Sequence, residues 1–289
     1  MPTVAILGAG PIGASVAQTL AGRARVRDVC LIDAAASVAA GKALDIRQSG
    51  PVESYDTRVS GEGDVLAAAG AGVIVIADSH ESGEWEGDRG LTLVRQLVNA
   101  GATAPFVFAG PKQTWLMEAV VRELGVPADR IVGTAAAALA GAARALVALE
   151  VNGSGADVSL VVAGRPPAFV IAWSSATIGG ALITDHVPAH RLVAIAQQTK
   201  GLWPTGPYAI AAATAPVVEG LLFGSRAQIP AVTIVDQEFG VRHGAALLPV
   251  SMGNGRVLAR HSPSFSPQER VDFMNALSSE SRSPGVQGS

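Results

Sequence analysis

The segment Val4-Ala-Ile-Leu-Gly-Ala-Gly-Pro-Ile-Gly-Ala-Ser-Val-Ala-Gln-Thr-Leu20 decides the fold that we predict for this chain. It begins with a short apolar run, Val4–Leu7, which predicts a buried strand. A cluster of glycines follows at 8–13, and apolar side chains then recur with helical spacing as far as Leu20. A strand, a glycine-rich turn and a helix in direct succession are typical of the first βα unit of a dinucleotide-binding sheet.

Each glycine of the turn has a separate physical role in such a unit. Gly8 allows the tight turn, Gly10 allows a pyrophosphate to approach the backbone, and Gly13 lets the helix pack closely on the strand. The helix begins at Pro11 and Ile12, where free backbone N–H groups and the positive end of the helix dipole favour phosphate. The alternative interpretation of the same pattern is an ordinary glycine turn.

An acid at the end of the next strand indicates which dinucleotide is bound. The apolar run Val29–Ile32 ends at Asp33, about twenty residues after Gly13. A carboxylate at this place accepts hydrogen bonds from both ribose hydroxyls and repels the extra phosphate of NADP. Strand, turn, helix and acid together predict that the chain binds NAD.

Composition excludes several other classes of protein. The 289 residues carry a net charge of −3 without blocks of like charge, which argues against nucleic-acid and membrane-surface partners. The single cysteine, Cys30, permits no disulfide within the chain and fits a reducing compartment. No group of His, Cys and Asp has the spacing of metal ligands, and no segment resembles a signal peptide or a membrane span. We expect a globular cytoplasmic protein without a bound metal.

Apolar runs alternate with helical segments through the first half of the chain. A run that is apolar at every position, such as Val73–Ala77, predicts a strand buried on both faces. Strands of this kind separated by helices predict a doubly wound parallel sheet, the Rossmann architecture, over residues 1–133. Further strands are expected near 57–59, 106–109 and 130–132, and helices near 38–45, 65–69, 90–100 and 115–124.

The pattern changes after Gly133. An alanine-rich helix extending to Leu149 is followed by segments that predict a mixed or antiparallel sheet, so we expect a second, α+β domain over residues 134–289. Its strands are expected at 158–162, 168–172, 231–235 and 246–250, and its helices at 191–198, 207–223 and after 266. Ser266 is the expected N-cap of the last helix, and Glu269 completes a capping box.

In this order of segments the chain resembles the malate/lactate dehydrogenase family over nearly its whole length. Several short motifs outside the glycine turn carry the resemblance and occur in the family's order. They are Gly41–Asp45 with Pro51–Glu53, Val132–Gly133, Thr205–Tyr208 with Val217–Glu219, Gln237–Val241 with Leu248–Val250, and Phe265–Leu277. The resemblance implies a Rossmann domain that binds NAD and a C-terminal α+β domain that binds substrate and contributes to oligomerisation.

The catalytic residues of that family are not matched. The resemblance implies a His–Asp pair that removes the proton of a 2-hydroxy acid during hydride transfer to NAD. Arg165 stands at the histidine position, and Ala140 replaces the aspartate. An arginine stays protonated at physiological pH and cannot act as the general base. Gly110 stands where the family has an asparagine that touches substrate and nicotinamide, and the following Pro111 implies a cis peptide bond there.

Two cations are the candidate catalytic groups of such a divergent site. Arg165 has a planar guanidinium that suits bidentate binding of a carboxylate or phosphate; the alternative is a structural arginine paired with an acid across the domain boundary. Lys112 follows Pro111 and is expected near the nicotinamide, where a desolvated lysine can act as a base; the alternative is a solvated loop lysine.

The mobile loop that closes over substrate in this family corresponds to residues 78–90. It carries five acids and one arginine, Arg89, which is the candidate for substrate binding together with Thr205 at the pocket wall. A loop this acidic favours a neutral or cationic small molecule over a dicarboxylate.

Two functions are consistent with these patterns. The first is an NAD-dependent oxidoreductase that transfers hydride on a substrate other than an ordinary 2-hydroxy acid. The second is a catalytically inactive NAD-binding protein with a structural, assembly or sensing role, which fold-level analogy cannot separate from the first. The resemblance also implies a homodimer or homotetramer that pairs through the first-domain helices and the alanine-rich helix.

Overall fold

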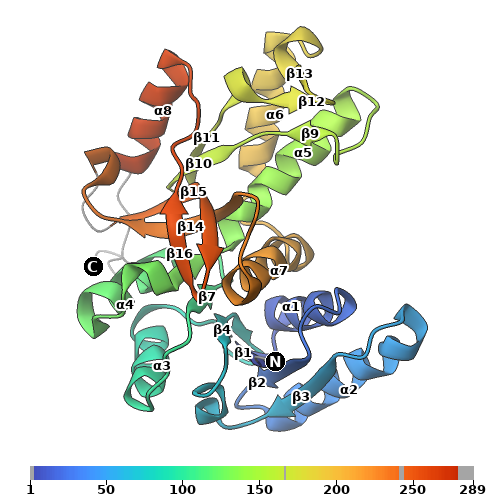
Figure 1. Cartoon of the computed structure of the whole chain (residues 1–289), viewed down its shortest axis with the longest axis vertical. Coiled ribbons are helices and arrows are strands. Elements are labelled where there is room, and N and C mark those ends of the chain that lie inside the picture. Colours follow the sequence, from blue (N-terminus) through green and yellow to red (C-terminus); the bar gives the residue numbers. More distant parts are fainter. Residues whose placement is uncertain (1–2, 166, 241–243, 279–289) are drawn as a thin grey trace, which may run out of the picture.

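The structure, a computed structural model, describes residues 3–165, 167–240 and 244–278. One continuous eleven-stranded sheet runs through the centre of the molecule (Figure 1). Its parallel part has the order β3-β2-β1-β4-β7-β8, which confirms the doubly wound sheet. These strands are β1 (Thr3–Leu7), β2 (Asp28–Ile32), β3 (Arg58–Glu62), β4 (Val73–Ile76), β7 (Phe106–Phe108) and β8 (Ile131–Gly133).

The sheet continues into antiparallel strands on the far side of β8. Thr233 of β14 pairs with Val132 of β8, and the order then runs β14-β15-β10-β11, with β16 paired to β15. These strands are β10 (Val162–Arg165), β11 (Ala168–Ile171), β14 (Ile229–Val235), β15 (Gly244–Gly253) and β16 (Arg256–Arg260). A separate small sheet contains β9 (Val158–Ser159), β12 (Thr177–Ile178) and β13 (Ala181–Leu182), and a two-stranded hairpin contains β5 (Asp78–Ser79) and β6 (Gly83–Glu84).

Helices cover both faces of the parallel strands because successive side chains of each strand point to opposite faces. Val4 and Ile6 of β1 pack in one hydrophobic cluster with α1, α2 and α7, whereas Ala5 and Leu7 pack in another with α3, α4 and α5. The helices are α1 (Pro11–Gly22), α2 (Ala36–Glu53), α3 (Gly87–Asn99), α4 (Thr114–Leu124), α5 (Ala138–Glu150), α6 (Ala189–Gly201), α7 (Pro207–Phe223) and α8 (Pro267–Ser278). Short 3₁₀ turns occupy Val65–Ala68, Ala128–Arg130, Ala135–Ala137, Trp173–Ser175, Ile183–Asp185 and Glu238–Gly240.

Local sequence signals account for several element ends. The capping box of α8 is confirmed: Ser266 N–H donates to Glu269 Oε2 at 2.8 Å, and Glu269 N–H donates to Ser266 Oγ at 3.3 Å.

The predicted strand at 158–162 was wrong as a single element, because the chain leaves β9 after Ser159 and enters the large sheet only at Val162. Val241 of the Gln237–Val241 motif lies outside the described residues.

The fold positions a site at the carboxyl ends of the parallel strands. The turn after β1, the residue after β2, the hairpin after β4 and the loop after β7 all lie at this edge, since the strands are parallel and adjacent. Such an edge, where the strand order reverses, is the usual ligand site of a doubly wound sheet. No helix of the described residues is long and apolar enough to cross a membrane, and within the same residues no cluster of His, Cys, Asp and Glu could hold a metal ion.

Candidate functional site

The turn after β1 has a geometry that only glycine permits. Gly8 has φ of +114°, and a Cβ on it would lie 2.2 Å from the carbonyl oxygen of Asp78. A Cβ on Gly13 would lie 1.9 Å from the carbonyl oxygen of Gly8, because α1 starts directly against the strand that precedes it. The turn and the close packing expected of Gly8 and Gly13 are therefore present.

The close approach at Gly10 is made by a side chain of the protein itself. A Cβ on Gly10 would lie 2.4 Å from the Asp78 carboxylate. That carboxylate accepts hydrogen bonds from the N–H groups of Ile12 at 3.2 Å and Gly13 at 2.9 Å, and Gly10 N–H donates to the Asp78 carbonyl at 2.8 Å. Asp78 is 6% exposed. The first amides of α1 thus already hold an anion.

Asp33, at the end of β2, is engaged in the same way. Its carboxylate accepts from the N–H groups of Ala9 at 2.8 Å, His80 at 2.8 Å and Ala35 at 3.0 Å, and the residue is 3% exposed. Burial by itself raises the pKa of Asp33, but the three backbone donors outweigh it and hold the pKa below its ordinary value. Its role toward a ribose stays a prediction.

The hairpin β5–β6 and the turn after it lie along these groups, and we call residues 78–86 the acidic strap. At its far end Glu84 Oε2 accepts from the N–H of Lys112 at 2.9 Å. A Cβ on Gly110 would lie 2.4 Å from the same oxygen, so Glu84 covers the loop after β7. Burial raises the pKa of Glu84, against the opposing effect of the Lys112 N–H.

Arg89, the candidate substrate-binding arginine, contacts the acidic strap. Its guanidinium donates to the carbonyl oxygens of Ser82 at 3.1 Å and Gly83 at 3.4 Å, and also to that of Glu84. The guanidinium carbon lies 4.7 Å from the centre of the Trp85 ring, within the range of a cation–π contact. These contacts hold the strap in shape; substrate binding by Arg89 remains a prediction.

The loop after β7 places Gly110 and Lys112 beside the strap. Gly110 N–H donates to the side-chain oxygen of Gln113 at 2.9 Å, and the buried Gln113 amide donates in turn to the Ala77 carbonyl at 3.0 Å. The Lys112 side chain is 67% exposed, with Nζ 3.9 Å from Glu86. The ammonium is therefore solvated rather than desolvated. A cis peptide bond occurs at Trp203–Pro204 and not at Pro111 as the resemblance implied.

Arg165, at the end of β10, is paired with an acid. Its guanidinium lies 2.7 Å from Glu118 Oε1 of α4, and the two side chains are 12% and 11% exposed. The same oxygen accepts from Ala245 N–H of β15 at 2.9 Å. The pair links α4, β10 and β15, which is the arrangement expected of the structural alternative.

Thr205, the candidate at the pocket wall, is buried and bonded to the backbone. It is 9% exposed, and its hydroxyl donates to the Ala135 carbonyl at 3.3 Å. The cavity between Gly110, Thr134 and Trp203 measures about 10 Å³, about the room that one water molecule needs.

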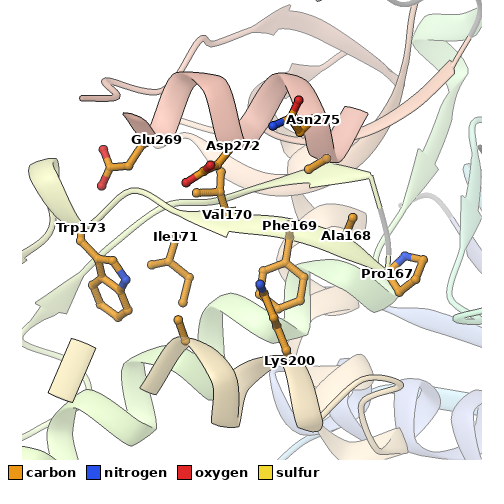
Figure 2. Close-up of a pocket in the computed structure, with 12 residues that line it drawn as sticks. Pro167, Ala168, Phe169, Val170, Ile171, Trp173, Lys200, Glu269, Asp272 and Asn275 are labelled. Carbon is orange, nitrogen blue, oxygen red and sulfur yellow. The ribbon is translucent and has the colours of Figure 1, made fainter. Parts of the chain in front are cut away.

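A second hollow, of about 630 Å³, lies away from the glycine turn, over the edge strand β11. Figure 2 shows Phe169, Ile171 and Trp173 directed toward α6, with Lys200 beside Phe169. On the α8 side the carboxylate of Glu269 is used by the capping box. None of the predicted site residues lines this hollow among the described residues, so it is not the site that the sequence predicts.

Sequence reasoning included Asp78 and Glu84 only as acids of the loop over the substrate, and it missed Glu118. The position of Asp78 was a signal that was not used, since it stands two residues after the carboxyl end of β4, the neighbour of β1 in the sheet. Glu118 is on a helix expected only to cover the sheet, and nothing in the sequence links it to Arg165.

Comparisons with known proteins give consistent results. Residues 3–95 match the family described as lactate/malate dehydrogenase, NAD binding domain. The chain is similar to malate dehydrogenase of Thermomicrobium roseum, with 30% identity over 93% of this chain and 92% of that protein. The structure is similar to that of malate dehydrogenase from Salinibacter ruber, with a TM-score of 0.85 at 24% identity over 95% and 93% of the two chains. It is also similar to lactate dehydrogenase from Cryptosporidium parvum in complex with lactic acid and NAD, with a TM-score of 0.85 at 21% identity over 95% and 94%.

Proposed function

The chain belongs to the malate/lactate dehydrogenase family, and from this membership we propose that it is a divergent member that does not dehydrogenate 2-hydroxy acids. It carries the family's NAD-binding domain, and NAD is the cofactor of that domain. The role that we propose for it is that of a catalytically inactive binding protein on a dehydrogenase fold.

The observation that carries this proposal is the ion pair between Arg165 and Glu118. The resemblance aligns Arg165 with the family's general base, and an arginine cannot accept a proton at physiological pH. Its guanidinium is directed to Glu118, whose carboxylate also binds Ala245 N–H. A largely buried, paired guanidinium supports a structural role and leaves the proton of a hydroxy acid without an acceptor at this position.

The dinucleotide groove does not fit its cofactor in this conformation. The first amides of a helix after a glycine turn are the usual site of the pyrophosphate. Here Asp78 occupies that position, and a second anion would meet it at contact distance and with like charge.

The test is turnover of the family's substrates. NADH oxidation with oxaloacetate or pyruvate, and NAD reduction with malate or lactate, would be followed by absorbance for the wild type and for Asp78→Asn. The variant is included so that a closed groove cannot be the reason for inactivity. No turnover by either protein supports the proposal. Turnover by either at about 1 s⁻¹ or faster, the ordinary range of enzymes, contradicts it.

A second candidate function is hydride transfer on a substrate other than an ordinary 2-hydroxy acid, and one observation favours it. Glu84 is half-buried, burial raises its pKa, and it lies against the loop that contains Gly110 and Lys112. A carboxylate whose pKa is raised is a stronger proton acceptor than an ordinary carboxylate. In this candidate function Lys112 and Arg165 orient the substrate, which is neutral or cationic.

This candidate has its own discriminating experiment. A panel of primary amines and neutral alcohols would be offered with NAD to the wild type, Asp78→Asn, Glu84→Gln and Glu81→Gln. Turnover that Glu84→Gln abolishes and the exposed control Glu81→Gln retains would establish the oxidoreductase. Inactivity of both the wild type and Asp78→Asn toward the whole panel would exclude this candidate function.

The division into domains and the assembly are further parts of the proposal. We propose domains of residues 1–133 and 134–289, supported by the change from parallel to antiparallel pairing between β8 and β14. A homodimer or homotetramer is supported by an alanine-lined groove between α5 and α7, which suits close helix packing. Light scattering after size-exclusion chromatography measures the mass; a monomer at all concentrations would contradict the assembly.

A further inference from the structure

We propose that the acidic strap, residues 78–86, is the chain's own occupant of the dinucleotide groove, and that a dinucleotide binds only by displacing Asp78 from the first turn of α1. The proposal goes beyond the loss of the dehydrogenase reaction, because it concerns access to the groove and not chemistry in it. It is carried by the contacts of the strap at three separate places along the groove.

The first place is the N-terminus of α1. Two N–H groups, of Ile12 and Gly13, point to the two carboxylate oxygens of Asp78 at 3.2 and 2.9 Å. These donors and the positive end of the helix dipole are the features that bind a phosphate after a glycine turn. Gly10 leaves room for a close approach, and Asp78 fills it, since a Cβ on Gly10 would lie 2.4 Å from its carboxylate. The Asp78 carboxylate therefore occupies the position at which a phosphate of the dinucleotide is expected.

The second and third places lie on either side of the first. His80 N–H donates to Asp33 Oδ2 at 2.8 Å, so the strap backbone uses an acceptor of the residue expected to bind the ribose. Glu84 Oε2 accepts from Lys112 N–H at 2.9 Å, at the loop expected to meet the nicotinamide. The strap thus contacts the groups expected to bind ribose, pyrophosphate and nicotinamide.

The outer side of the strap is held by a separate residue. Arg89 of α3 donates to three successive carbonyls of the strap and lies over the ring of Trp85. It makes these contacts without touching the first turn of α1 in any contact the structure records. Its removal is therefore a way to loosen the strap while the amides of Ile12 and Gly13 and the carboxylate of Asp33 stay intact.

A groove that the acidic strap occupies binds an external dinucleotide with lower apparent affinity. When only a fraction of molecules has an open groove, the apparent dissociation constant rises by the inverse of that fraction. Like charge adds to the effect, because the phosphates of NADH and the carboxylate of Asp78 compete for the same donors. Weakening the strap at either Asp78 or Arg89 should therefore tighten dinucleotide binding.

The experiment is a titration with NADH, followed by its fluorescence, on five proteins: wild type, Asp78→Asn, Arg89→Ala, Glu81→Gln and Arg95→Ala. Asp78→Asn keeps the shape and one acceptor but removes the charge. Glu81→Gln removes an exposed charge from the same strap, and Arg95→Ala removes an exposed arginine from the same helix, so both are matched controls. Thermal melting of each variant verifies that it is folded.

The expected result is at least tenfold tighter NADH binding by Asp78→Asn, a ratio that corresponds to about 1.4 kcal/mol. A smaller gain in the same direction is expected for Arg89→Ala, and both controls should match the wild type. Unchanged or weaker binding by both folded strap variants would overturn the proposal. The outcome is separate from that of the turnover assay, because tighter binding without turnover supports both proposals and tighter binding with turnover contradicts only the loss of catalysis.

Discussion

Replacement of Arg165 by methionine tests the structural role that separates this chain from its relatives. The substitution keeps a long side chain but leaves Glu118 without its 2.7 Å cationic partner, in a place where both side chains are only about one-tenth exposed. Removing one member of a buried pair costs about 3–5 kcal/mol, because the remaining charge loses its ion-pair partner. We take the lower end, about 3 kcal/mol, because Ala245 N–H still binds the carboxylate. For a chain of this size that predicts a fall in Tm of roughly 6–12 °C.

The assay is urea unfolding followed by circular dichroism. The double variant Arg165→Met/Glu118→Gln should recover most of the loss, since the neutral amide oxygen still accepts from Ala245 N–H. The control is Arg122→Met, which breaks an exposed pair with Glu123 and should change the free energy of unfolding by less than about 1 kcal/mol. An Arg165→Met protein as stable as the wild type would refute the reasoning, because the arginine would then be free for another role.

Three further predictions concern the groove. Gly13→Ala should destabilise the chain by about 3 kcal/mol or more in urea unfolding, because its Cβ would meet the Gly8 carbonyl at 1.9 Å, whereas Gly41→Ala, which has open space in α2, should be neutral or stabilising. Since the folded-state pKa of Asp33 is lowered, its charge stabilises the fold above the ordinary aspartate pKa and the stabilisation is lost as pH falls through the folded value. The loss in free energy of unfolding caused by Asp33→Asn should thus be largest at about pH 7 and shrink toward about pH 3. A loss that does not change with pH would contradict this prediction. The folded-state pKa of Glu84 is raised, so the charged form of Glu84 is disfavoured in the fold. Glu84→Gln should therefore melt at a slightly higher temperature than the wild type at about pH 7, and at the same temperature at about pH 4. A lower melting temperature of the variant at both pH values would contradict this.

The parts of the fold that follow from local sequence were predictable. In three segments the residues themselves determine the local structure: the apolar run Val73–Ala77, the glycine turn and the Ser266–Glu269 capping box. The structure has a buried strand, a tight turn and a capped helix at these places. The alanine-rich segment was less informative. Its helix α5 begins only at Ala138, because the residues before it form β8 and a 3₁₀ turn.

The occupant of the site was not predictable by the same reasoning. The pattern around Gly10 indicates that a negatively charged group approaches the backbone, and this is correct. It cannot indicate whether that group comes from a ligand or from Asp78, which is 65 residues away from Gly13 along the chain. Likewise the acidity of residues 78–90 suggested a cationic substrate, whereas Asp78, Glu84 and Glu86 have partners within the chain. The charge pattern of a segment predicts that complementary groups lie against it, but it does not identify those groups.

Hydrogen exchange of the acidic strap, with and without NADH, tests the central claim most directly. Amides of the strap that are protected in the free wild type should exchange faster at saturating NADH, because Asp78 leaves the amides of Ile12 and Gly13 and the His80 N–H leaves Asp33. The same amides should already exchange faster in free Asp78→Asn. If NADH binds tightly to the wild type while the strap keeps or gains protection, the strap is no occupant of the groove and the account is wrong.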